Sequence, residues 1–191
     1  MKIGVLALQG DFDAHRKRLE ELGADVLMVR KPEQLDEVDG LVIPGGESSV
    51  FLNLLGQKGF QKLAEYVRTR PTFGTCAGCI LLAREVENPA QSGLGVLDIT
   101  VRRNAYGRQV DSTILVGESK LGGPALEQVY IRAPRIERVG PEVEVLSERD
   151  GHPVLVRQGH TLAATFHPEL SPDTRVHKEF LRMVQQPSPE K

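Results

Sequence analysis

The sequence predicts an α/β protein with a mostly parallel central sheet covered on both faces, to which antiparallel strands are added. Two observations support this prediction. In the first half, short and uniformly apolar runs alternate with helix-length runs, as is typical of a parallel sheet buried on both faces. After about residue 93, short β-rich runs are separated by Gly, Pro, Asp and Asn, which is typical of antiparallel strands.

The first half of the chain contains most of the expected strand–helix alternation. Residues 2–8 are uniformly apolar and predict a buried strand. A helix is expected over about 12–22, with Asp11 or Asp13 capping its start and Gly23 just past its end. The other expected elements here are strands at 24–29, 40–43 and 71–73, and helical segments at about 32–38, from near 50, at about 58–69 and at 80–84.

The second half adds short strands and one last helix. Asp150-Gly151 is a favourable hairpin turn, the last helix is expected over about 173–185, and the Pro-rich tail 186–191 is expected to fray. No repeat or linker interrupts the chain, so we expect a single domain, 1–191. The strands expected in this half are 96–103, 109–116, 129–131, 143–147, 154–157 and 162–166.

Composition narrows the functional class. The chain has 191 residues, 40% hydrophobic and 26% charged, which is ordinary for a globular protein with a substantial core. A net charge of −2 argues against a nucleic-acid or membrane-surface protein. The apolar N-terminal run is too short for a signal peptide or a transmembrane helix, so we expect a cytoplasmic location. Two cysteines three positions apart do not form a disulfide framework.

The stretch Gly74-Thr75-Cys76-Ala77-Gly78 predicts a nucleophile on a sharp strand-to-helix turn. Small neighbours are needed there, because the backbone is cramped and the side chain must stand clear of it. The pattern is that of the Gly-x-Ser-x-Gly elbow with cysteine in the serine position. A helix beginning at this turn directs unpaired N–H groups and its positive dipole end toward the thiol, which favours the thiolate.

His167 is the best candidate for the base that Cys76 needs. It follows an apolar strand and opens His167-Pro168-Glu169. The residue before a proline is held extended, so residues 167 and 169 point the same way. Glu169 is then placed to orient the imidazole while the other ring nitrogen faces the thiol. The alternative is a surface loop that holds a histidine and a glutamate by chance.

The loop Pro44-Gly45-Gly46-Glu47-Ser48 lies at the carboxyl end of an expected parallel strand, the edge where open α/β sheets bind ligands. Its two glycines allow the backbone to approach a ligand and to direct an N–H at a developing oxyanion. The N–H of Ala77 is a candidate second donor. The alternative is a plain turn before a helix.

These three motifs together resemble the class I (triad) glutamine amidotransferases. Further runs narrow the resemblance to the glutaminase subunits of pyridoxal 5′-phosphate synthase, and the similarity extends over essentially the whole chain. It implies a flavodoxin-like three-layer domain. The additional runs are residues 3–10 (Ile-Gly-Val-Leu-Ala-Leu-Gln-Gly), 103–109 (Arg-Asn-Ala-Tyr-Gly-Arg-Gln) and 131–134 (Ile-Arg-Ala-Pro).

The resemblance implies a glutaminase mechanism. Cys76 attacks the side-chain amide of L-glutamine, His167 protonates the departing ammonia, and Glu169 orients His167. A glutamyl thioester forms and is hydrolysed to glutamate. The oxyanion hole is assigned to Gly45, Gly46 and Ala77, and the substrate-binding residues are assigned as Gly46, Glu47, Ser48, Arg103, Ile131 and Arg132. Arginine is the usual partner of a carboxylate such as that of glutamine, although an arginine taken alone is more often a solvated surface residue.

The resemblance also implies a protein partner. In such enzymes the ammonia passes to a synthase subunit, in a large multi-subunit complex, and glutaminase activity is weak until that partner binds. Docking is implied near Gln9-Gly10. Pyridoxal 5′-phosphate is the product of the complex, and hydrolysis itself needs no cofactor or metal.

Cys79 makes the elbow read Cys-x-x-Cys, which admits a redox dithiol as an alternative. No Cys/His cluster completes a zinc site, and we expect Cys79 to pack as a small apolar side chain. A thiol redox sensor and a non-catalytic scaffold are the competing functions, but neither requires the His167-Pro168-Glu169 motif. The remaining histidines are expected to have no role: His15, His152, His160 and His177.

Overall fold

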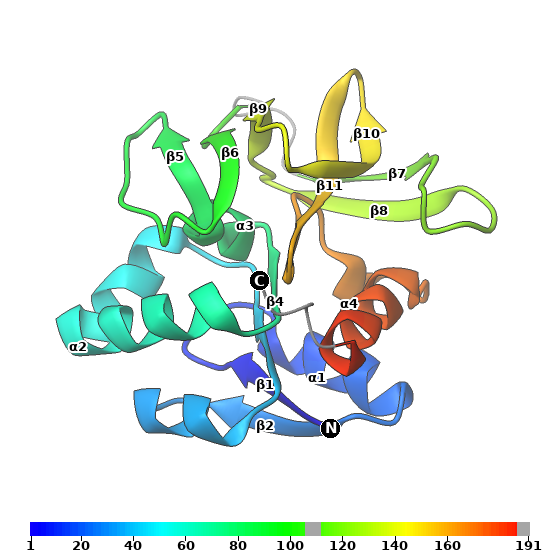
Figure 1. The fold of residues 1–191 in the computed structure, drawn as a ribbon. Coiled ribbons are helices and arrows are strands. Elements are labelled where there is room, and N and C mark those ends of the chain that lie inside the picture. The colour runs from blue at the N-terminus through cyan, green and yellow to red at the C-terminus, as the bar shows by residue number, and fades with distance from the viewer. Residues whose placement is uncertain (106–111, 187–191) are drawn as a thin grey trace.

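The computed structural model describes residues 1–105 and 112–186, and its centre is a seven-stranded sheet (Figure 1). The strand order is β10-β11-β12-β4-β3-β1-β2. The strands are β1 (Lys2–Leu6), β2 (Asp25–Val29), β3 (Gly40–Ile43), β4 (Thr72–Thr75), β10 (Glu144–Arg149), β11 (His152–Gln158) and β12 (Thr161–Ala164).

Five of these strands are parallel, from β2 at one edge to β12. Their order, β2-β1-β3-β4-β12, is the flavodoxin-like order with β12 as the fifth strand. β11 and β10 extend the sheet in antiparallel fashion. Asp150 and Gly151, which connect these two strands, both have positive φ, as a type I′ hairpin turn requires. The predicted parallel sheet with antiparallel additions is therefore confirmed.

Apolar side chains on both faces of the sheet build two cores. Successive strand residues point to opposite faces, so Leu41 and Ile43 enter one core while Val42 enters the other. One face is covered by α2 (Ser48–Thr69) and the other by α1 (Phe12–Glu21) and α4 (Arg175–Gln185), as Figure 1 shows. The result is three layers, with β2 and β3 connected through the 3-10 helix η1 (Pro32–Glu37).

Two small sheets lie at the end of the molecule away from β2 (Figure 1). One contains β5 (Ala83–Glu87), β6 (Leu97–Arg102) and β9 (Arg135–Val139), and the other is the antiparallel pair β7 (Ser112–Gly117) and β8 (Leu126–Ile131). Leu97, Ile99 and Ile136 bury the first sheet against the α2 side. Leu126 and Tyr130 bury the second against the α1 and α4 side.

Several predicted boundaries were wrong. The helix after Cys76 is α3 (Ala77–Leu82) rather than 80–84, because Ala83 already pairs with Leu97 at the start of β5. Neither β5 nor β9 was predicted. By contrast, the two helices expected from near 50 and over 58–69 are confirmed: α2 consists of two helical segments that meet at a kink at Gly56, whose backbone is non-helical (φ 62°, ψ 179°). The expected strand 109–116 is observed from Ser112, since residues 106–111, like 187–191, lie outside the described part of the chain.

The caps of the helices differ from expectation at one point. Asp11 is the N-cap residue of α1, but its side chain makes no capping hydrogen bond, and Asp13 pairs instead with Arg16 one turn later. Gly23, with φ 81°, follows the end of α1 as predicted. Glu47 caps α2 by accepting a hydrogen bond from the Ser49 N–H at 3.4 Å.

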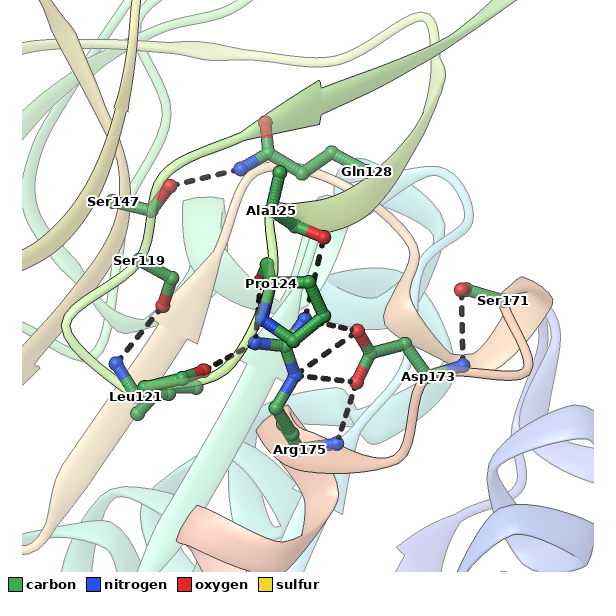
Figure 2. A network of polar contacts seen from close by, with 10 residues as sticks. Ser119, Leu121, Pro124, Ala125, Gln128, Ser147, Ser171, Asp173 and Arg175 are labelled. Carbon is green, nitrogen blue, oxygen red and sulfur yellow. Dashed lines mark hydrogen bonds and ion pairs between the residues drawn. The ribbon is translucent and has the colours of Figure 1, made fainter.

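An arginine at the start of α4 fastens the β7–β8 connection to the main domain (Figure 2). The Arg175 guanidinium donates to the carbonyls of Gly122, Pro124 and Ala125 and pairs with the Asp173 carboxylate. This cluster holds β8 beside the segment that leads from β12 into α4. Within the described residues, no helix has the length and apolar character needed to cross a membrane.

Candidate active site

The candidate residues meet because three parallel strands end side by side. In the order β12-β4-β3, Ala164 is paired with Thr75, and Gly74 with Ile43. The chain therefore leaves the three strands toward Phe166-His167, Cys76 and Pro44-Gly45-Gly46 at the same edge. The Cys76 N–H donates to the Ala164 carbonyl at 2.9 Å, which fixes the nucleophile turn against β12. The expected convergence at one edge of the sheet is confirmed.

Cys76 occupies a strained turn. It has φ 48° and ψ −104°, a conformation that non-glycine residues adopt rarely and chiefly at functional sites. It is the N-cap of α3, so the first N–H groups of that helix, beginning with Ala77, have no acceptor within the helix. A Cβ at Gly78 would lie 2.1 Å from the Ile43 carbonyl oxygen, which explains the small residue on this side of the elbow.

Gly45 fits between the candidate nucleophile and the candidate base. A Cβ at this position would lie 2.5 Å from Cε1 of His167 and 3.4 Å from Cβ of Cys76. The backbone of the predicted oxyanion loop therefore passes close to both side chains. No residue larger than glycine fits without displacing one of them.

His167 and Glu169 form a buried pair beside the thiol. Nδ1 of His167 lies 2.7 Å from Oε1 of Glu169, and the two residues are 6% and 2% exposed. Burial disfavours charge on His167, but its hydrogen bonds with Cys76 and Glu169 outweigh burial and raise its pKa to about 10. Burial also raises the pKa of Glu169, but the nearby His15 and the hydrogen bond with His167 make the net shift downward. The pair therefore favours imidazolium beside carboxylate.

A cavity of about 450 Å³ opens next to Cys76 and His167. Arg103 extends into this site as an ion pair with Glu47, at 2.8 Å. The Cys76 thiol lies 3.9 Å from the Ile131 carbonyl oxygen. All six residues expected to bind substrate line the cavity: Gly46, Glu47, Ser48, Arg103, Ile131 and Arg132. Their roles, and those of the triad and the oxyanion loop, stay predictions.

Cys79 does not share the environment of Cys76. Its side chain is fully buried among apolar residues of the α2-side core. Burial, with a smaller contribution from the nearby Cys76, raises the pKa of the Cys79 thiol, which disfavours the thiolate needed for redox exchange. The prediction that Cys79 packs as a small apolar side chain is confirmed.

Two histidines that were expected to have no role, in the first and the last helix, lie directly behind the site. His15 on α1 and His177 on α4 are both fully buried, and Nε2 of His15 lies 3.4 Å from Oε2 of Glu169. A signal was available in the sequence: His15 is one helical turn before the buried Leu19, on the apolar face of α1.

The Gln9 side chain forms hydrogen bonds with the backbone of the loop at residues 44–48. Its side-chain amide donates to the Glu47 carbonyl at 2.7 Å and accepts from the Glu47 N–H at 3.3 Å. This pair of hydrogen bonds fixes the loop from the β1 side. Within residues 1–105 and 112–186, His, Cys, Asp and Glu side chains form no cluster of three or more suited to a metal ion.

The fold is that of a class I glutamine amidotransferase. A solved structure titled as a glutamine amidotransferase is 44% identical, with a TM-score of 0.89, over 96% of this chain and 99% of the other. A glutamine amidotransferase from Thermotoga maritima has the same fold, with a TM-score of 0.62 at 16% identity, over 96% of this chain and 83% of the other.

Sequence comparison defines the family within this class. The chain belongs to the SNO glutamine amidotransferase family, whose model matches residues 5–186. It is similar to a protein of Koribacter versatilis named pyridoxal 5′-phosphate synthase subunit PdxT, at 73% identity over 96% of both chains. A protein of the same name from Thermosipho africanus is 53% identical over 96% of this chain and 99% of its own length.

Proposed function

We propose that this protein hydrolyses L-glutamine to L-glutamate and ammonia, and that the ammonia passes to the synthase subunit of pyridoxal 5′-phosphate synthase. Membership of a glutamine amidotransferase family supports the first part. The name shared by the similar proteins, pyridoxal 5′-phosphate synthase subunit PdxT, supports the second. A cytoplasmic location is part of this proposal.

The observation that carries the proposal is the pairing of a buried Cys76–His167–Glu169 set with a polar cavity at the same edge of the sheet. The cavity matches glutamine in chemical type. Arg103 and Arg132 supply guanidinium groups for the α-carboxylate. Glu47 and the Ile131 carbonyl supply oxygens for the α-ammonium. The amide end of the substrate is then directed toward Cys76.

In the first half-reaction the Cys76 thiolate attacks the amide carbon of glutamine. A positive charge on His167 stabilises the thiolate before attack. The carbonyl oxygen becomes an oxyanion, which the N–H groups of the Gly45–Gly46 peptide and of Ala77 stabilise. His167 then donates its proton to the amide nitrogen, the C–N bond breaks, and ammonia leaves behind a glutamyl thioester.

In the second half-reaction water hydrolyses the thioester. His167, now neutral, accepts a proton from the attacking water, and Glu169 stabilises the imidazolium that forms again. The C–S bond breaks, glutamate is released, and the thiolate–imidazolium pair is restored. These steps use only side chains, backbone N–H groups and water, so the proposed mechanism requires no cofactor.

Glutamate release from glutamine, measured with and without the synthase subunit, tests the proposal. Cys76→Ala is expected to abolish release, and His167→Asn to come close to doing so. Glu169→Gln is expected to cost less, because an orienting group contributes less than the nucleophile. Wild-type turnover by Cys76→Ala would overturn the catalytic assignment. An absence of stimulation by the synthase subunit would overturn the proposed partnership.

A further inference from the structure

A line of buried polar groups continues behind the triad into the core between α1 and α4. Glu169 uses Oε1 for His167, at 2.7 Å. Its second oxygen, Oε2, is buried and has no hydrogen-bond partner among the described residues, and it lies 3.4 Å from Nε2 of His15. The same nitrogen lies 3.1 Å from Oγ1 of Thr75, the residue before Cys76. His15 therefore lies between the orienting carboxylate and the nucleophile's strand.

A second histidine supports the first. Nδ1 of His15 lies 3.0 Å from Nε2 of His177, and both rings are fully buried. Phe73 packs against both imidazoles in edge-to-face geometry, with centroid distances of 6.0 and 5.7 Å. Helices α1 and α4 thus contribute one ring each to a fixed pair. Core packing alone does not require two imidazoles, because apolar side chains fill such space without the cost of burying polar atoms.

The hydrogen-bond pattern assigns the protons. Nδ1 of His177 is buried and has no hydrogen-bond partner within residues 1–105 and 112–186. An orphaned buried N–H is rarer in proteins than an orphaned acceptor, so the proton of neutral His177 belongs on Nε2. His177 then donates to Nδ1 of His15, which places the His15 proton on Nε2, facing Thr75 and Glu169. Burial lowers the pKa of both histidines, that of His177 to about 3, in agreement with two neutral rings.

We propose that His15 is a positioning residue of the catalytic set: its Nε2–H donates to Oγ1 of Thr75 beside Cys76 and lies 3.4 Å from Oε2 of Glu169 as an electrostatic neighbour, while His177 fixes the tautomer of His15. The inference rests on the proposed glutaminase function. It extends the Cys76–His167–Glu169 set by two residues from the two helices on one face of the sheet. The charged groups that act on His15 are Glu169, His167 and Asp11. Arg18, also on α1, donates to the backbone carbonyl of Glu169 at 3.4 Å.

The test compares His15→Leu with His15→Gln in the complete complex with the synthase subunit. Leucine removes the N–H, whereas the glutamine amide is long enough to place an N–H near the position of Nε2. We expect His15→Leu to lower kcat by about 10-fold to 100-fold with KM little changed, as for groups that orient metal-binding histidines. His15→Gln is expected to recover most of the loss, and His177→Leu to give a smaller loss. His160→Leu is the control, because His160 contacts the Val67 carbonyl away from the site.

A pH profile separates positioning from simple destabilisation. Without the His15 N–H the Glu169 carboxylate loses a stabilising neighbour, so its pKa rises and the acid limb of kcat moves to higher pH. A purely structural role predicts equal losses in His15→Leu and His15→Gln with an unchanged limb, and that result would overturn the proposal. The proposal would also be overturned if His15→Leu had the kcat of the wild type and the same acid limb in its pH profile.

A readout independent of glutamine distinguishes this inference from the proposed function. In a Cys79→Ala background, the rate of alkylation of Cys76 by iodoacetamide is measured against pH, with circular dichroism as the check of folding. His15→Leu is expected to shift this profile and His15→Gln to restore it. If the wild type fails to hydrolyse glutamine in the presence of the synthase subunit, the proposed function is wrong. The positioning role of His15 is judged separately: a shifted alkylation profile in His15→Leu supports it, and an unshifted profile contradicts it. If His15→Leu does not fold, the comparison of His15→Gln with His177→Leu decides: wild-type profiles in both contradict the proposal.

Discussion

Gly45 shows how little space separates the groups that are proposed to react. Its missing side chain leaves room for both His167 and Cys76 to approach the loop. A methyl group there would overlap Cε1 of His167 and displace the imidazole from its contact with the thiol. Misplacing a reacting group by about 1 Å costs on the order of 100-fold in rate.

We therefore expect Gly45→Ala to lower glutaminase kcat by about 100-fold or more. Folding is expected to survive, because the loop lies at the edge of the sheet rather than within a core. Gly59→Ala is the matched control: a Cβ there, on α2, meets its nearest atom at 3.4 Å. Activity and thermal unfolding are measured for both variants, and near-wild-type activity in Gly45→Ala would contradict the proposed geometry.

Cys79 provides a second test at the level of one residue. Because its thiol is buried and its pKa raised, we expect Cys79→Ala to retain glutaminase activity within about twofold, a change that corresponds to less than about 1 kcal/mol in the barrier. Activity is compared before and after mild oxidation and reduction in the wild type and the variant. If the variant lost a redox response that the wild type has, the dithiol alternative would be favoured.

At the level of elements, local sequence pattern and strand pairing favoured different structures at β5 and β9. The run Ala83–Glu87 continues a helical sequence, yet it forms β5, because pairing with β6 and burial of Val86 outweigh a weak local preference. β9 was missed for a related reason: its charged residues read as a loop, while Ile136 alone is fully buried. The apolar pattern of β1 to β4 by itself predicts a strand, and these four strands were predicted close to their observed bounds.

The cluster around Arg175 gives a prediction for an element junction. Replacing Arg175 by alanine removes the donors to three carbonyls between β7 and β8 and leaves Asp173 without its partner. We expect a loss of about 2 kcal/mol in the free energy of unfolding, by the range for hydrogen bonds to charged groups. Arg182→Ala, which removes an exposed pair with Glu179 on the same helix, is the control with little expected effect. Chemical denaturation measures both, and equal stability of the two variants would contradict the clamp.

For the molecule as a whole, the buried histidine pair predicts how stability depends on pH. His177 has its pKa lowered to about 3 in the folded state, against about 6.5 when unfolded. Between these values the unfolded chain binds more protons than the folded one, so the free energy of unfolding falls as pH drops below about 6.5. Carboxylates with lowered pKa values add their own losses only at more acid pH.

We expect His177→Leu to flatten the fall in stability between about pH 6.5 and pH 5, where the histidines dominate. Thermal unfolding is recorded across this range for the wild type, for His177→Leu and for His152→Leu, a hairpin position outside the buried pair. A slope in His177→Leu as steep as that of the wild type would show that the pair does not control acid sensitivity.

The sequence by itself determined the parallel sheet, the elbow at Cys76 and the approach of Cys76, Gly45 and His167 at one edge. It did so because each signal is local: apolar runs, small residues around a turn, and a His-Pro-Glu motif directly after a strand. The extended backbone predicted from His167 to Glu169 was wrong: Pro168–Leu170 form the 3-10 helix η2, with His167 (φ −109°, ψ 82°) as its N-cap, and the His167–Glu169 contact is made across this turn. Only the tertiary structure decided that His15 and His177 lie behind Glu169. These residues are 162 positions apart and meet through the packing of α1 and α4 on one face of the sheet. Such contacts depend on how the helices pack against the sheet, and no local sequence pattern specifies that packing.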